Sequence, residues 1–153
     1  MNFKTTEQAQ FWDRFCTKTN RLLDTVCYEV FYFDDDEETA NDLCERVLKG
    51  KKRATCSSYD YYLNEHISMP RVGDLSLFTD WEGHPKGVIQ TTNIEILAFE
   101  DVDKERFERE GEDDTLETWR EGHLSYFRPQ VPDFNMKSKV VFEDFDLIYI
   151  ENE

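Results

Sequence analysis

The 153-residue chain has little of what places a protein in a membrane or cross-links a secreted domain. No stretch approaches the ~18 consecutive apolar residues of a membrane-spanning helix, and the first residues lack the basic-then-apolar order of a signal peptide. Only four cysteines occur, with no Cys-x-x-Cys pair and no His at metal-ligand spacing beside them. We therefore predict a cytoplasmic protein that has no membrane span, no metal site and no cofactor.

Positive charge is also scarce, because 18 Lys and Arg stand against 34 Asp and Glu, for a formal net charge of -16. This balance repels phosphate backbones at long range, so we expect no duplex-DNA partner. Four cations nevertheless fall within residues 49–53, in the segment KGKKRATCSS that covers residues 49–58. This basic turn is therefore the first place to look for a site.

Apolar material is ample, since hydrophobic residues make up 39% of the chain and aromatic residues 14%. A chain of this length supports one core. We expect a single globular domain, in which residues 1–27 form an N-terminal helical extension and residues 28–150 the main domain. In the extension, Phe11, Trp12 and Phe15 predict a helix that packs its aromatic side chains inward. No pattern predicts an oligomeric state.

The clearest helix signal follows the acidic run at residues 34–38. Asp34 to Asp36 can supply an N-cap, the two glutamates suit the positive end of a helix, and Gly50 ends the apolar periodicity. Further helices are predicted over about 103–110 and 114–127. In the second, Asp114 and Glu117 indicate a capping-box start.

Strands are predicted over residues 27–33, 53–58, 75–80, about 87–99 and 138–150, with a turn at 69–74 and a hairpin loop at 81–87. The last strand must pair with earlier ones because no sequence remains to pair after it. Strands mixed irregularly with helices indicate an α+β fold.

Three segments in order carry a resemblance to a known family. VLKGKKRATCSS contains Gly-x-Lys-x-x-Thr at Gly50, Lys52 and Thr55; VGDLSLFTDWEGHPKGVIQTT is similar to a Gly-Asp turn and central hairpin; EGEDDTLETWREGHLSYF is similar to a Glu-Gly-Glu signature followed by Trp-Arg and His. Together they resemble a bacterial branch of the ASCH family over roughly residues 28–150. The resemblance implies a curved, barrel-like, mostly antiparallel sheet with flanking helices, similar to the PUA domains of RNA-modifying proteins.

Two positions depart from the family pattern. Many members carry Arg two residues after the motif Thr, whereas this chain has Ser57. This difference weakens any phosphate contact there. The branch often has Glu-Gly-Glu-Gly-Asp where this chain has Asp113 in place of the second Gly, so we expect a changed turn before the next helix.

Some ASCH proteins resemble a bacterial amidohydrolase that acts on acetylcytidine, and the resemblance assigns its catalytic roles to Lys52, Thr55 and Glu112. A Thr hydroxyl needs a base, and a Lys becomes that base only if burial lowers its pKa. Glu112 would then orient the amine or shuttle a proton. The alternative is structural: Lys52 is an exposed charge, Thr55 an ordinary strand residue, and Glu112 a carboxylate favoured by a helix N-terminus.

Ligand contacts are expected from the basic turn, from the aromatic residues after it and from the last predicted helix, because an aromatic beside cations suits a nucleobase and its phosphate. The candidates are Gly50, Lys51, Arg53, Ser57, Tyr59, Tyr62, Arg120 and His123. The competing interpretation packs one or two of the tyrosines into the core. Cys56 is not the expected nucleophile, because strand neighbours point to opposite faces and Thr55 is placed in the cleft.

The sequence thus predicts an ASCH-domain protein that binds a nucleoside or RNA-like ligand around the Gly-x-Lys-x-x-Thr motif. Amide hydrolysis on an acylated nucleoside is one hypothesis for its activity. The alternatives are a non-catalytic module for single-stranded or structured RNA, a ribonuclease that uses the same cleft, and an acidic protein-interaction domain. Burial of Lys52 beside Glu112 favours chemistry, whereas exposure of Lys52 argues against it.

Overall fold

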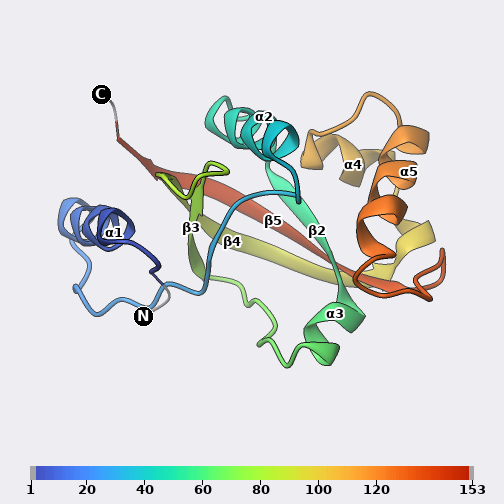
Figure 1. Ribbon diagram of the computed structural model, residues 1–153, viewed down its shortest axis with the longest axis horizontal. Helices are drawn as coiled ribbons and strands as arrows, with labels where there is room; N and C mark the ends of the chain where they lie inside the picture. Colours follow the sequence, from blue (N-terminus) through green and yellow to red (C-terminus); the bar gives the residue numbers. More distant parts are fainter. Residues whose placement is uncertain (1–2, 152–153) are drawn as a thin grey trace.

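The computed structural model describes residues 3–151 as one five-stranded sheet with helices packed around it (Figure 1). The sheet order is β1-β3-β4-β5-β2, and every neighbouring pair is antiparallel except β1 and β3. The predicted α+β class with a mostly antiparallel sheet is confirmed, although the sheet stays open, with β1 and β2 at its edges. The elements are α1 (Thr6–Lys18), β1 (Val30–Phe31), α2 (Glu37–Leu48), β2 (Ala54–Ser58), α3 (Tyr59–Asn64), β3 (Leu75–Thr79), β4 (Pro85–Ala98), η1 (Phe99–Asp101), α4 (Lys104–Glu110), α5 (Leu116–Phe127) and β5 (Lys139–Ile150).

The two long strands β4 and β5 form the centre of the sheet and pair from Gly87 with Ile150 to Ala98 with Lys139. Register shifts interrupt this pairing after Val88 and around Thr91, where extra residues bend an antiparallel ladder. The final strand pairs on its other side with β2, so Thr55 lies on an edge strand and Lys52 lies in the turn just before it. The C-terminal strand therefore does pair with earlier ones, as predicted.

Local signals account for most helix ends. Asp36 caps α2, because its side chain accepts a hydrogen bond from the backbone N–H of Thr39 at 2.9 Å. The start of α5 differs from the prediction: Thr115, rather than Asp114, is the N-cap and accepts from the N–H of Thr118 at 3.1 Å. The predicted strand at 27–33 shrinks to Val30–Phe31, and the short helix α3 was not predicted.

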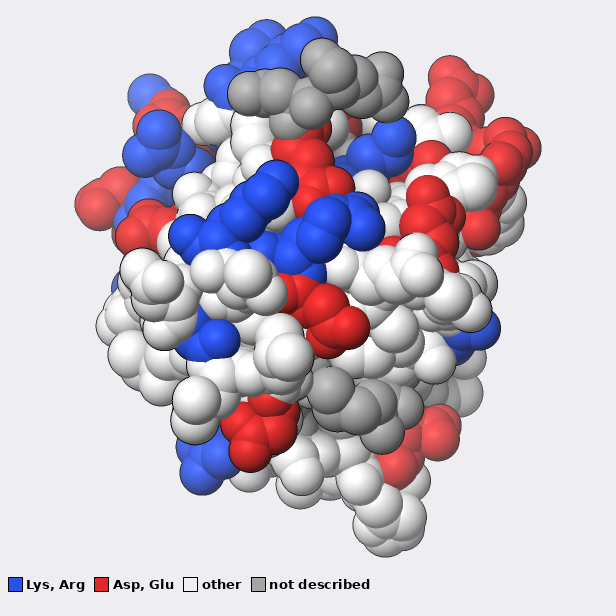
Figure 2. Space-filling model, turned by 90° about the vertical axis from the view of Figure 1, so that its left-hand side faces the viewer, with Lys and Arg blue, Asp and Glu red and all other residues white. Residues whose placement is uncertain are grey.

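Surface charge is mixed at the end of the molecule that carries α1. In the view of Figure 2, Lys and Arg form a short band, and Asp and Glu lie directly above and below it. Among residues 3–151, no helix has both the length and the apolar character that crossing a membrane requires.

Helices cover both faces of the sheet, as alternation along β3 shows. Leu75 and Leu77 pack with Phe11, Trp12 and Phe15 of α1. Phe78 points to the opposite face and packs with the α2 side chains. The helix predicted around the three aromatic residues is confirmed, and all three are buried. Since both faces are covered, every residue of β3 is buried.

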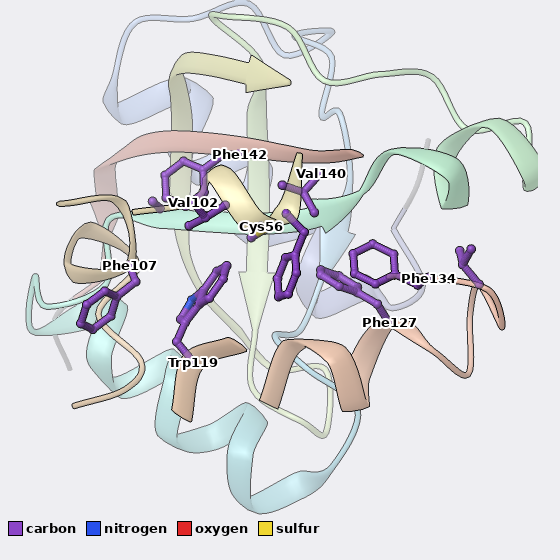
Figure 3. Close-up of a cluster of buried hydrophobic side chains, with 11 residues drawn as sticks. Cys56, Val102, Phe107, Trp119, Phe127, Phe134, Val140 and Phe142 are labelled. Atoms are coloured by element: carbon purple, nitrogen blue, oxygen red, sulfur yellow. The ribbon is translucent and has the colours of Figure 1, made fainter. Parts of the chain in front are cut away.

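A third hydrophobic cluster joins the β2 edge to α4 and α5 (Figure 3). Cys56 and Phe142, which are paired across β2 and β5, pack there against Trp119 and Phe127. The cluster fixes the position of α5 beside the edge strand. It thereby places the α4–α5 connection, which carries the Glu-Gly-Glu signature, next to the basic turn.

Candidate functional site

The basic turn directs one cation inward and the others outward. Lys52 is 1% exposed, whereas Lys51 and Arg53 are exposed on either side of it. Gly50 makes this possible by adopting φ +77°, after which the N–H groups of Lys51 and Lys52 both donate to the carbonyl of Arg46. The turn that ends α2 therefore buries Lys52.

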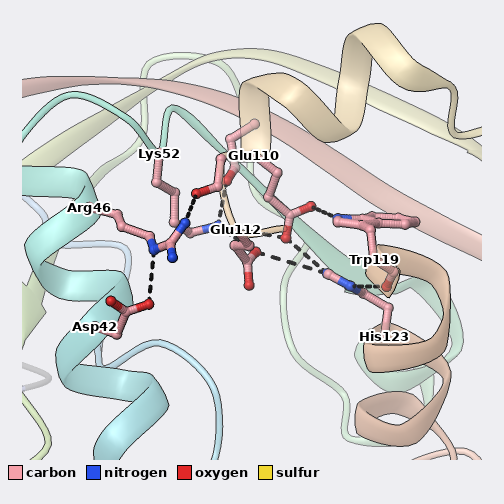
Figure 4. Close-up of polar contacts among 9 residues, drawn as sticks. Asp42, Arg46, Lys52, Glu110, Glu112, Trp119 and His123 are labelled. Carbon is pink, nitrogen blue, oxygen red and sulfur yellow. Dashed lines mark hydrogen bonds and ion pairs between the residues drawn. The ribbon is translucent and has the colours of Figure 1, made fainter. Parts of the chain in front are cut away.

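The Lys52 ammonium lies among acceptors (Figure 4). Its Nζ donates to the Ala54 carbonyl at 2.7 Å and to Glu112 Oε2 at 2.8 Å, and it lies 3.6 Å from Glu110 Oε1. The Phe33 ring lies 5.4 Å from the same nitrogen. An ammonium group has three donors, so two are committed to close partners and the third has only a distant one.

Glu110 joins Lys52 to helix α5. Its carboxylate is 1% exposed and accepts from Trp119 Nε1 at 3.0 Å, while its second oxygen lies 2.9 Å from His123 Nε2. His123 Nδ1 faces the Trp119 carbonyl at 2.8 Å, so Nδ1 must carry a proton. A carboxylate on the Nε2 side then favours the imidazolium. Below, the Lys52 network means Lys52, Glu110, Glu112, Trp119 and His123.

Gly111 separates the two glutamates of the network and admits no other residue. Its φ is +69°, and an added Cβ would lie 2.0 Å from the Lys51 carbonyl oxygen. Arg46 Nη1 donates to the Gly111 carbonyl at 3.0 Å, which ties α2 to this connection. Asp113 is not among the positive-φ residues of the described chain, so Asp in place of the family's second Gly introduces no backbone strain.

The pKa of Lys52 does not meet the condition that sequence reasoning set for a general base. Burial alone would lower it, but the charges of Glu112 and Glu110 raise the net pKa above its usual value. Lys52 is therefore an ammonium at rest and not a free base. Burial likewise opposes the ionised form of Glu110, yet His123 and Lys52 hold the pKa of Glu110 well below its usual range.

Glu112 and His123 titrate closest to neutral pH within the network. Burial first, and then the charge of Glu110, raise the pKa of Glu112 to about 8. Burial would lower the pKa of His123, but the charge and hydrogen bond of Glu110 raise it to about 9. A carboxyl group whose pKa lies near the working pH suits proton transfer. Glu112 is therefore the acid–base candidate of the network.

A cavity of about 500 Å³ adjoins the network and reaches all five strands. Its size falls within the roughly 300–1,000 Å³ of small-molecule sites. Thr55 lines it, and within residues 3–151 the Thr55 hydroxyl makes no hydrogen bond. Lys52 and Glu112 line the same cavity. The three residues assigned to catalysis by the resemblance therefore share one space.

The other predicted contacts divide into two groups. Ser57, Tyr62 and His123 line the cavity. The residues that do not line it are Gly50, Lys51, Arg53, Tyr59 and Arg120.

Two of these outer residues have structural partners instead. Arg120 Nη2 donates to the carbonyls of Glu100 and Val102, both at 3.1 Å, and so ties α5 to η1. The Tyr59 ring lies 5.7 Å from Lys139 Nζ. Neither side chain is directed at the cavity.

Cysteine chemistry does not contribute a nucleophile here. All four cysteines are buried, and Cys56 packs in the third hydrophobic cluster although it also borders the cavity. Burial raises the pKa of the Cys56 thiol well above its usual value. Cys56 therefore stays a thiol, which is a poor nucleophile.

Glu110, Glu112 and His123 also have the donor types of a metal site, and their ligand atoms lie within 4.8 Å of one another. The Lys52 ammonium, however, lies 2.8 Å from one of these carboxylates and already supplies positive charge. Glu110 is further occupied by the Trp119 and His123 nitrogens. The contacts present thus describe a proton-carrying network rather than a ligand set waiting for a cation.

The polar cavity residues that sequence reasoning missed include Glu29, Ser76, Thr91 and Glu143. They come from distant segments that only the sheet brings together. The one available signal was Glu143, an acidic residue inside an apolar strand and directly across from Thr55. Glu110 was also missed, although it belongs to the Glu-Gly-Glu signature.

The family model for the ASCH domain matches residues 29–149. The structure resembles protein EF3133 from Enterococcus faecalis with a TM-score of 0.86 and 28% identity, covering 94% of this chain and 89% of that one. It resembles an ASCH domain from Lactobacillus crispatus with a TM-score of 0.85 and 28% identity, covering 97% and 99%. ZmASCH from Zymomonas mobilis shares the fold at 13% identity, with a TM-score of 0.50 over 80% of this chain and 72% of that one. No curated protein matches the chain.

Proposed function

The chain belongs to the ASCH domain family, and we propose that it binds a nucleoside-like small molecule in its cavity and hydrolyses an acyl amide on that ligand. One observation carries the proposal. Lys52 is buried 2.8 Å from Glu112, in the same cavity as the unpartnered Thr55 hydroxyl. A buried ion pair beside a free hydroxyl is costly for a purely structural role, and its components are those of a nucleophilic site.

In the proposed reaction, the Thr55 oxygen adds to the amide carbonyl carbon, and the hydroxyl proton passes to ionised Glu112. The C–N bond then breaks as Glu112 returns that proton to the leaving nitrogen, which leaves an acyl ester on Thr55. Water hydrolyses the ester by the same proton route and releases the carboxylic acid. Lys52 stays an ammonium and stabilises the oxyanion through its uncommitted donor.

This assignment exchanges two of the roles that the sequence resemblance implied. Lys52 was expected to be the base, but its raised pKa favours the protonated form. Glu112 takes over proton transfer because its pKa of about 8 allows both forms near neutral pH. The same three residues are retained with different tasks.

The cavity favours a small ligand over RNA. Of its lining residues, seven are Asp or Glu, one is Lys and one is His. A phosphate backbone is repelled by such a lining, and the exposed cations Lys51 and Arg53 lie outside it. We therefore place single-stranded RNA below an unphosphorylated nucleoside as a ligand.

The test is incubation with cytidines acylated on the exocyclic nitrogen, followed by chromatographic detection of cytidine. Wild type should release cytidine, and Lys52→Ala should not. Lys51→Ala is the matched control, because it removes the neighbouring but exposed charge and should behave as wild type. Thr55→Val tests the hydroxyl in a variant that loses no internal hydrogen bond.

Background-level release in wild type and Lys52→Ala alike would refute the enzymatic proposal. Full activity in Thr55→Val would refute the nucleophile. Shortened single-stranded RNA in a parallel incubation would instead support the ribonuclease alternative.

A further inference from the structure

A second set of polar side chains, separate from the Lys52 network, lines the cavity. It consists of Glu29, Ser76, Thr91 and Glu143, which we name the acceptor subsite. Glu143 is paired with Thr55 across β5 and β2, so both side chains rise from the same face of the sheet as neighbours. The acceptor subsite therefore begins next to the proposed nucleophile.

Ser76 shows that the subsite is directed at the cavity. Its neighbours Leu75 and Leu77 pack on the α1 face, so the Ser76 side chain points to the opposite face, where the cavity lies. Ser76 is 5% exposed, and within residues 3–151 its hydroxyl has no hydrogen-bond partner. The hydroxyl opens onto the cavity and is not sealed in the core, because in residues 3–151 the one fully buried side-chain polar atom without a partner is Arg120 Nε. A ligand atom in the cavity would satisfy the Ser76 hydroxyl.

The two carboxylates of the subsite also lack cationic partners. Among residues 3–151, no Lys, Arg or His forms an ion pair with Glu29 or Glu143. Within residues 3–151, the Glu143 carboxylate accepts a long hydrogen bond from Thr91 Oγ1, at 3.4 Å. Burial raises the pKa of both carboxyl groups to about 7, and the charge of Glu29 adds to the effect on Glu143.

Above about pH 7 both carboxyl groups are ionised, and an ionised carboxylate accepts hydrogen bonds and donates none. We infer that the acceptor subsite binds a group rich in hydrogen-bond donors and free of negative charge, so that the ligand is an unphosphorylated molecule. Two common groups share this chemistry: the vicinal hydroxyls of a ribose and a primary ammonium group. The inference rests on the proposed function in one respect: it assumes that the molecule bound at the acceptor subsite is the same substrate whose amide lies beside the Lys52 network.

Calorimetric titration of the full chain tests the inference without requiring turnover. The probes are cytidine, 2′-deoxycytidine, cytidine 5′-monophosphate and putrescine. Cytidine or putrescine should bind at least about tenfold more tightly than the monophosphate, because an added phosphate meets carboxylates. Glu143→Gln should weaken the better ligand roughly tenfold, since it replaces charged acceptors by a neutral amide.

The other two probes, 2′-deoxycytidine and putrescine, identify which chemical group supplies the hydrogen-bond donors. Weaker binding of 2′-deoxycytidine than of cytidine would assign the subsite to ribose hydroxyls, and putrescine binding that depends on Glu143 would assign it to an ammonium group. Glu105→Gln is the matched control, because it removes one carboxylate from a side chain that is 83% exposed and outside the cavity. It should leave every affinity unchanged.

Equal affinities for cytidine and its monophosphate would overturn the inference, as would unchanged binding in Glu143→Gln or no binding of any probe. If Glu143→Gln does not fold, Ser76→Ala and Glu29→Gln carry the same test. Hydrolysis of acylated cytidine that is insensitive to Glu143→Gln would refute the subsite while leaving the proposed function intact.

Discussion

The Lys52 network and the acceptor subsite, at the two ends of the cavity, differ in how their buried charges are compensated. In the Lys52 network, every ionised group has an opposite charge or a strong donor within about 3 Å. In the acceptor subsite, Glu29 and Glu143 have no cation and Ser76 has no partner among the described residues. Groups that are paired with one another inside the protein, as in the Lys52 network, are suited to chemistry. Hydrogen-bonding groups that face the cavity without a cationic partner, as in the acceptor subsite, are suited to binding a ligand.

Breaking the network should have the largest effect on stability. Lys52→Met leaves Glu110 and Glu112 buried without their cation, and we expect the free energy of unfolding to fall by about 3–5 kcal/mol. Urea unfolding followed by circular dichroism measures the loss. Adding Glu112→Gln should cost little further, because without Lys52 the Glu112 carboxyl, whose pKa is already raised to about 8, is protonated near neutral pH. An additive double variant would contradict the coupling.

Removing a neutral donor should cost less than removing the cation. Trp119→Phe leaves the indole position filled by an aromatic ring but deprives Glu110 Oε2 of its 3.0 Å donor. We expect a loss of about 1–3 kcal/mol, as for a buried acceptor left without its partner. Thermal unfolding at equal protein concentration checks this, and an unchanged midpoint would show that Glu110 does not depend on Trp119.

The free energy of unfolding should depend on pH in the way expected for a buried carboxyl group without a cationic partner in the acceptor subsite. The pKa of Glu143 is about 7 in the folded protein and about 4.3 in an unfolded chain. The stability associated with protonated Glu143 is therefore complete below about pH 4 and is lost as the pH rises to about 7. Glu143→Gln should match wild type at low pH and exceed it by about 1 kcal/mol at pH 8, allowing for solvent contact. A variant less stable at pH 8 would contradict this account.

The stability contributed by the Lys52 network should be lost over a different pH range from that of the acceptor subsite. Because the pKa of His123 is raised to about 9 in the folded protein and is about 6.5 when unfolded, its contribution is present below about 6.5 and is lost as the pH rises through 9. Glu143→Gln should leave this alkaline loss in place. Following unfolding of wild type and variant from pH 4 to pH 10 therefore separates the two ends of the cavity in one experiment.

The smallest effect is expected from the exposed part of the basic turn. Lys51→Ala should change the free energy of unfolding by less than about 0.5 kcal/mol, because the side chain is solvated and is not part of the Lys52 network. Ligand binding in the cavity should also be unchanged. A large loss of affinity would move the site from the cavity to the exposed cations and revive the RNA-binding alternative.

Local patterns predicted the parts of the molecule that local chemistry decides. The acidic run before residue 37 supplied the Asp36 cap, and Gly50 ended the α2 region as its positive φ requires. The motif spacing placed Lys52 and Thr55 at the helix-to-strand junction, where the structure has them. Each of these depends on residues a few positions apart.

The rest depends on residues that only the sheet brings together. Glu112 and Glu110 raise the pKa of Lys52, and Glu112 lies 60 residues away along the chain, so the sequence could not show whether the condition for a general base is met. Glu29 comes from the segment before β1 and Glu143 from β5, and no periodicity links them. Compensation of charge is a property of the assembled cavity, so the sequence could not reveal which end lacked it.

The most direct test of the central claim compares turnover and stability in Thr55→Val. The Thr55 hydroxyl makes no hydrogen bond within the described chain, so its removal should leave the unfolding midpoint within the range of an ordinary surface change. We predict that release of cytidine from acylated cytidine falls by about a thousandfold or more, as for loss of a nucleophile. Turnover that survives in a fully folded Thr55→Val variant would contradict the account.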